Sequence, residues 1–190
     1  MNLKHYQIQL VGFVLLFCLS TIWTLQAQTG AAFGINNDYL VKINLETAEL
    51  EPLFKLNLPE DASLRNLVYI PKDTAFYSTI YFDTKPSLLR IDHNGKWTII
   101  GRFKVGQQFP YFCKALTYNG VKDELILSVS LDGGKEMNDD KAEALAIVNR
   151  KTAACKLLAT IRQLPPPDDF EELAVYRNQL FCFDADVEKK

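Results

Sequence analysis

One polar segment, LDGGKEMNDDK, gathers most of the side-chain oxygens that could bind an ion. Its candidate ligands are Asp132, Glu136, Asn138, Asp139 and Asp140. Carboxylate and amide oxygens on a glycine-containing loop are the ligands that Ca²⁺ prefers. The spacing departs from the EF-hand pattern because no third ligand precedes Gly133, and the segment also fits a solvated surface loop. We therefore expect a binding loop here, with calcium as the candidate ion.

Other reactive residue types are sparse. His93 is the only histidine after the first 27 residues. The sequence therefore offers few of the residues from which a catalytic triad or a histidine metal site is built. The DGGK stretch lacks the serine or threonine of a phosphate-binding loop. Asp168, Asp169, Glu171 and Glu172 follow three prolines and fit a stiff, solvated connector better than an acid–base pair. The sequence favours a chain without a catalytic set.

Residues 1–27 have the layout of a secretory signal peptide. Lys4 and the amino terminus precede the apolar run VGFVLLFCLSTIWTL, and Ala27 offers a small residue for cleavage. The alternative is a retained membrane anchor, since Gln9 to Leu25 reaches the lower limit of about 17 residues for a span. Polar residues dilute that core, so we expect cleavage and a secreted or periplasmic chain without a stable membrane span.

The remaining chain, residues 28–190, has the length of one domain. The full sequence is 48% hydrophobic with a formal net charge of −2, which predicts a packed core and excludes the basic face of a nucleic-acid-binding protein. Cys113, Cys155 and Cys182 lie in apolar contexts with no repeated spacing. Buried thiols are favoured over one disulfide plus one thiol.

Short runs that alternate apolar and polar residues fill this chain, which is typical of half-buried strands. Examples are YLVKINL, TAFYSTIYF, ELILSVS and QLFCF. We therefore predict an all-β fold. Aromatic residues in such runs are expected in the core, whereas VGQQFPYF lies in a connector and is expected to expose its rings.

A hairpin phrase recurs in INLETAEL, IDHNGKW and VNRKTAACKLL. Its anchors Asn44, Asp92 and Asn149 are 48 and 57 residues apart. A second phrase is anchored by tyrosines at intervals of 49 and 58 residues, namely Tyr69, Tyr118 and Tyr176. The matching intervals predict structural repeats, with the longer interval caused by an insertion at residues 131–144. In IDHNGKW, Asn-Gly predicts a two-residue turn.

Each repeat holds four strands, which predicts four-stranded antiparallel blades in units at about 28–58, 64–104, 113–161 and 171–184. In these phrases the chain resembles secreted bacterial β-propellers, whose repeats carry an aliphatic-Tyr pair and an Ile-Asp-x-x-Thr-Gly turn. It departs from them in having Thr-Ala where Thr-Gly is usual. It also lacks the Trp-Asp pair of WD repeats and the double glycine of kelch repeats.

The strand count predicts an incomplete or small propeller-like array. Three strands come first, two full four-stranded units follow, and the last unit has two strands. Closed into a ring, these strands would make only about three blades, and known propellers have four to eight. A truncated propeller, a ring shared with another copy and an open array all fit this count. Unpaired blade edges would favour self-association.

The leading functional hypothesis is a non-enzymatic, exported binding or interaction module. Its ligand, a protein, peptide or carbohydrate, would contact the loops between strands. The resemblance to propellers implies an alternative, a calcium-dependent hydrolase of the lactonase type, and a remnant without its own activity is a third.

Overall fold

The computed structural model describes residues 31–82, 85–131, 143–161 and 170–184. This part of the chain is built from short strands and one 3-10 turn, Pro71–Asp73, so the all-β prediction is confirmed. The strands are β1 (Ala31–Asn36), β2 (Tyr39–Asn44), β3 (Leu50–Lys55), β4 (Ser63–Ile70), β5 (Ala75–Phe82), β6 (Lys85–Asp92), β7 (Trp97–Arg102), β8 (Lys104–Val105), β9 (Phe112–Asn119), β10 (Glu124–Ser130), β11 (Glu143–Val148), β12 (Ala154–Ile161), β13 (Phe170–Tyr176) and β14 (Gln179–Asp184).

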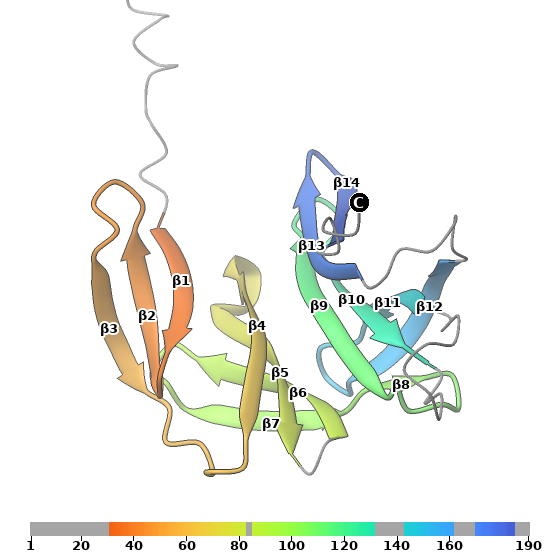
Figure 1. The fold of residues 1–190 in the computed structure, drawn as a ribbon, viewed down its shortest axis with the longest axis horizontal. Coiled ribbons are helices and arrows are strands. Elements are labelled where there is room, and N and C mark those ends of the chain that lie inside the picture. Colours follow the sequence, from red (N-terminus) through yellow and green to blue (C-terminus); the bar gives the residue numbers. More distant parts are fainter. Residues whose placement is uncertain (1–30, 83–84, 132–142, 162–169, 185–190) are drawn as a thin grey trace, which may run out of the picture.

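The strands form four sheets that follow one another along the chain. Their orders are β1-β2-β3, β4-β5-β6-β7, β8-β12-β11-β10-β9 and β13-β14. Neighbours pair antiparallel, except that β8 adds to β12 in parallel. The sheets fan out around a common centre, with β1, β4 and β9 toward it and β3, β7 and β12 at the outside (Figure 1). The result is an open, propeller-like array of blades.

Among the strands that the structure describes, β8 is the one that the sequence does not predict. Its two residues, Lys104 and Val105, pair with Ala154 and Cys155 on the outer edge of the third sheet. A pair of residues is too short to show any periodicity. The connector between the second and third sheets therefore also ties them together.

A separate apolar cluster fills each space between successive sheets. The first joins Leu40 and Leu56 to Phe76 and Ile91 of the second sheet. The second and largest lies between the second and third sheets, and the third sets Leu173 of β13 against β9, β10 and β11. In β5, six consecutive residues from Ala75 to Ile80 are buried, because the two faces of this central sheet are both covered.

Polar groups reinforce these interfaces. The Trp97 indole donates a 2.7 Å hydrogen bond to the carbonyl of Leu56, which joins the first two sheets. The Tyr81 hydroxyl lies 2.8 Å from both the carbonyl oxygen and the amide nitrogen of Cys113. Burial raises the pKa of Tyr81 to about 12, so this hydroxyl keeps its proton. Asn119 donates to Asn178 at 2.9 Å between the last two sheets.

The repeated Asn…Thr-Ala phrase builds the same turn twice. The side-chain oxygens of Asn44 and Asn149 each accept amide hydrogen bonds from within the turn. Their carbonyls accept from the amides of Ala48 and Ala153, both at 2.8 Å. Both alanines have φ of 58°, in the left-handed region. Because glycine adopts that region without steric cost, glycine would fit this position of the turn with less strain than alanine.

Replacing Ala48 with glycine is expected to raise the free energy of unfolding by about 1 kcal/mol, because the left-handed strain on an exposed alanine is removed. The matched control is Ala153→Gly, where the same relief is offset by the loss of a fully buried methyl group. Urea unfolding of both variants measures the difference. Equal stabilisation by both would contradict this explanation.

The turn at Asn94-Gly95 differs from the two-residue hairpin that the sequence predicts, so that prediction is wrong. Ile91 pairs with Trp97, and the Asp92 amide donates to the carbonyl of Lys96, which leaves a longer loop. The Asp92 carboxylate accepts amide hydrogen bonds within the loop, which lower the pKa of Asp92. Gly95 has φ of 79° and lies against Phe54 of the first sheet, where an added Cβ would lie 2.6 Å from the Phe54 Cβ and 2.7 Å from the nearest ring atom.

The cysteine prediction is confirmed at two positions. Cys113 and Cys155 are buried as thiols among the apolar residues between the second and third sheets. Burial raises the pKa of both thiols, to about 11 for Cys155. These groups are therefore neutral packing elements near pH 7.

Candidate functional site

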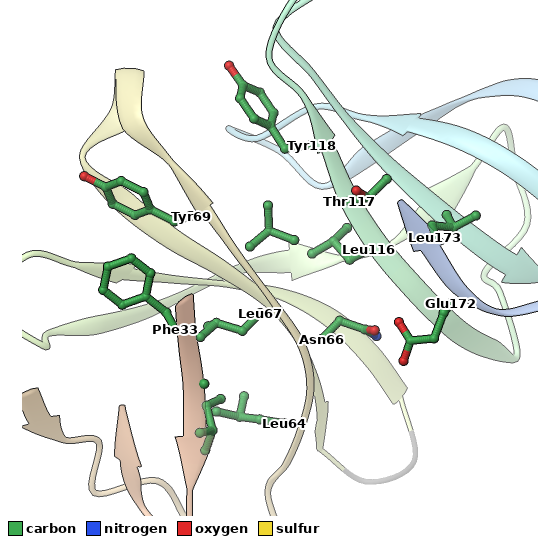
Figure 2. Close-up of a pocket in the computed structure, with 13 residues that line it drawn as sticks. Phe33, Leu64, Asn66, Leu67, Tyr69, Leu116, Thr117, Tyr118, Glu172 and Leu173 are labelled. Carbon is green, nitrogen blue, oxygen red and sulfur yellow. The ribbon is translucent and has the colours of Figure 1, made fainter. Parts of the chain in front are cut away.

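The inner strands β4, β9 and β13, together with β1, surround an open hollow of about 680 Å³, called here the inner hollow. Apolar side chains alternate with polar groups on its wall, and each sheet contributes to it (Figure 2). Its lining residues are Phe33, Gly34, Ile35, Leu64, Asn66, Leu67, Val68, Tyr69, Leu116, Thr117, Tyr118, Glu172 and Leu173. A concave site with a few convergent polar groups is the usual form of a binding site.

Each inner strand is interrupted by a β-bulge. In β4 the register shifts between Arg65 and Leu67. In β9 it shifts opposite Ser128 and Val129 of β10, and in β13 it shifts between Phe170 and Glu172. A bulge bends the strand and changes the direction of its side chains, and bulges are common beside functional sites. The wall of the inner hollow is therefore curved by three local irregularities.

Asn66 is the bulged residue of β4 and has φ of 59°. Its side-chain amide donates a 2.9 Å hydrogen bond to the carbonyl of Lys114, the bulged residue of β9. The two bulges are thus joined directly across the second and third sheets. Figure 2 shows Glu172 from β13 pointing toward Asn66, which brings polar groups from three sheets to one side of the hollow.

A cluster of aromatic side chains lies on the other side of the inner hollow. Phe33 of β1 lies against Phe76 with ring centroids 4.9 Å apart, and against Tyr69 at 5.7 Å. Tyr69 is 38% exposed, so part of its ring faces the hollow while part packs on its neighbours. Two of the repeated tyrosines, Tyr69 and Tyr118, thus line the hollow, whereas the third, Tyr176, is 60% exposed.

A charged network lies beyond Tyr118, at the turns between the second and third sheets. The Arg150 guanidinium pairs with Asp73 at 2.8 Å and with Asp123 at 2.9 Å. Asp123 also pairs with Lys72 and accepts a hydrogen bond from Tyr118. Arg150 first, and Lys72 after it, hold the pKa of the Asp123 carboxyl well below its usual range. One arginine therefore fixes two turns of different sheets.

A smaller hollow of about 300 Å³ lies at the opposite ends of these sheets, called here the basic hollow. It is lined by Lys85, Arg102, Phe109, Tyr111 and neighbouring residues, and Arg102 lies 4.3 Å from the centroid of the Phe109 ring. Phe109 is 49% exposed and Tyr111 is 67% exposed, which confirms the prediction for two of the three rings of VGQQFPYF. For the third ring the prediction is wrong, because Phe112 is half-buried and belongs to β9.

The predicted loop ligands lie outside the described residues. Asp132, Glu136, Asn138, Asp139 and Asp140 all fall in the segment 132–142, and the prediction of a calcium-binding loop is untested. Within the described ranges, no group of three or more His, Cys, Asp or Glu side chains is arranged to hold a metal ion. No helix in those ranges is long and apolar enough to cross a membrane.

Reasoning from the sequence missed the inner hollow. Its walls come from four sheets, and only their packing brings Phe33, Asn66, Thr117 and Glu172 together. One signal was present: asparagine is unfavourable in strands, and Asn66 interrupts the apolar run SLRNLVYI. The sequence favours a solvated connector at Glu172, and this prediction is wrong because the structure places Glu172 in β13.

Comparison with solved structures gives several partial likenesses. No family model and no curated protein matches the chain. The structure of a nidogen/laminin complex aligns with 77% of this chain at 17% identity and a TM-score of 0.48. The Malassezia sympodialis allergen Mala s 1 aligns with 87% at 12% identity and a TM-score of 0.36. The chain spans about half (48%) of the first protein and 65% of the second.

Proposed function

We propose that the chain is a non-enzymatic, exported binding or interaction module whose ligand enters the inner hollow. The observation that carries this proposal is the convergence of four sheets on one open, concave wall. Aromatic and aliphatic groups on the wall supply contact area, and Asn66, Thr117 and Glu172 supply hydrogen-bonding groups that orient a ligand.

The rigid frame around the hollow supports the same proposal. The Asn66 bond to β9, the Arg150 network and the core between the second and third sheets fix the relative positions of β4 and β9. A preformed wall reduces the conformational entropy that a ligand must overcome on binding. The loop at 132–142 remains a second proposed contact, with calcium as its candidate ion.

Replacing Thr117 with arginine is expected to abolish binding, because a long charged side chain from β9 would fill the hollow. Thr98→Arg on the outer strand β7 is the matched control, since Thr98 is exposed away from the hollow. A ligand-observed NMR screen of short peptides and oligosaccharides against the three proteins measures the effect. Compounds that bind all three equally would show that binding occurs elsewhere, and the proposal would fail.

A further inference from the structure

The inner edge of β1 is unpaired within the described residues. In the second and third sheets, β4 and β9 lie inside β5 and β10 and complete the sheet toward the hollow. In the first sheet, β1 pairs with β2 on one side and occupies the edge on the other. That edge is part of the hollow wall, through Phe33, Gly34 and Ile35.

The repeats define what would fit at this edge. Ala31 pairs with Asn44 as Ala75 pairs with Asp92, so β1 and β5 occupy equivalent positions. In the second sheet, β4 pairs antiparallel with β5 from Ser63 to Ile70, apart from the bulge at Asn66. A strand on β1 would take the same place, antiparallel to residues 31–36, with one face toward the ring of Phe33.

The backbone of β1 offers hydrogen bonds in this direction. Hydrogen bonding alternates along an antiparallel pair, so half of the amide and carbonyl groups of β1 point away from β2. Such an edge is a template for another strand, and proteins use it to bind extended peptides. Main-chain bonds then supply affinity, and alternate side chains supply specificity.

The chemistry of the peptide follows from the strands in the equivalent position. The strands β4, β9 and β13 read SLRNLVYI, FCKALTYN and FEELAVY, with aliphatic residues in their second halves and a shared tyrosine. Glu172 adds a carboxylate to the hollow wall, which disfavours an acidic segment. An extended segment of aliphatic residues with an aromatic one, and without acidic residues, matches this environment.

We propose that β1 binds such a segment of a partner protein as an added antiparallel strand, which completes the first sheet. This inference rests on the proposed function and adds the binding mode and the class of partner. It places the peptide backbone along Ala31–Asn36 and its side chains against Phe33 and the wall of β4.

The test uses an acetylated, amidated peptide with the sequence of β4, SLRNLVYI, and two N-methylated forms. One form is methylated at the amides equivalent to Leu67 and Tyr69, the other at those equivalent to Val68 and Ile70. In an added antiparallel strand, only every second residue donates its amide to the neighbouring strand, so only one of the two methylated sets lies at the edge of β1. One form is therefore expected to bind about tenfold more weakly than the unmodified peptide, and the other with little change.

The full chain is titrated with each peptide by isothermal calorimetry. Equal affinity of the two methylated forms would overturn strand addition while leaving the hollow as a binding site, which the Thr117→Arg comparison tests separately. No binding of the unmodified peptide would also overturn strand addition, and hits from the NMR screen would still support the proposed function.

Protein variants give an independent check. Ile35→Lys places a charge on the open edge and is expected to abolish binding of the unmodified peptide. Leu50→Lys is the control, since Leu50 is 48% exposed on β3 at the far edge of the same sheet. Circular dichroism confirms that both variants fold. Undiminished binding by a folded Ile35→Lys variant would contradict the proposed edge.

Discussion

Replacing Phe103 with alanine is expected to lower the free energy of unfolding by about 3–5 kcal/mol. Phe103 is fully buried and belongs to the cluster between the second and third sheets, with Leu88 on one side and Leu127 and Val129 on the other. Removing the ring leaves a cavity that these strands cannot close without breaking their pairing. Because a domain has about 5–15 kcal/mol of stability, this loss is a large part of it.

Phe109→Ala is the matched control for this substitution. Phe109 lies six positions further along the same connector but is 49% exposed, with Arg102 over its ring. Its removal is expected to cost less than about 1 kcal/mol. Urea unfolding followed by the fluorescence of Trp97 measures both variants. Equal losses would contradict the assignment of Phe103 as the side chain that holds the second and third sheets together.

Arg150→Met is expected to lower the free energy of unfolding at pH 7 by about 1–3 kcal/mol. The Arg150 side chain is 18% exposed, and its guanidinium pairs with Asp73 and Asp123, which lie on turns of the second and third sheets. The variant leaves both carboxylates near each other without their shared cation. Partial exposure to water keeps the loss below that of a fully buried ion pair.

The effect of Arg150→Met should depend on pH. The pKa of Asp123 is lower in the folded chain than its unfolded value of about 4, so its ion pairs stabilise the fold above that pH. This stability is lost as the pH falls below about 4 toward the folded pKa. The difference between the wild type and Arg150→Met should therefore shrink between about pH 5 and pH 2, because the Asp123 carboxyl of the unfolded chain is protonated in this range and that of the folded chain is not.

Lys72→Met provides the control for the network. Lys72 pairs with the same Asp123 carboxylate, but its side chain is 69% exposed, so a smaller loss is expected. Chemical unfolding at a series of pH values measures the three proteins. A difference between wild type and Arg150→Met that stays constant down to pH 2 would show that Arg150 acts through packing and not through its charge.

The strand pattern and the repeats could be predicted from the sequence because they depend on local residue order. Alternating apolar residues and two sets of similarly spaced anchors predict the positions of nearly every described strand, from the short β1 to the two-stranded sheet β13-β14. The anchors recur because Asn44 and Asn149 cap the same kind of turn. Strand β5 shows the limit of alternation, since six consecutive buried residues reflect two covered faces.

The candidate site could not be predicted because it depends on how the sheets pack. Asn66 reaches the carbonyl of Lys114 across 48 positions in the sequence, and Arg150 reaches Asp73 across 77. No local pattern encodes such distances. The bulges that curve the wall are equally hidden, since an extra residue in a strand changes the pairing without changing the composition.

The most direct measurement is an amide-resolved NMR map of the full chain with a ligand from the peptide and oligosaccharide screen. Binding in the inner hollow predicts the largest shifts at residues 33–35 of β1, 64–69 of β4, 116–118 of β9 and 172–173 of β13. Shifts centred on residues 132–142, or on the outer strands β3, β7 and β12, would contradict the inner hollow as the binding site.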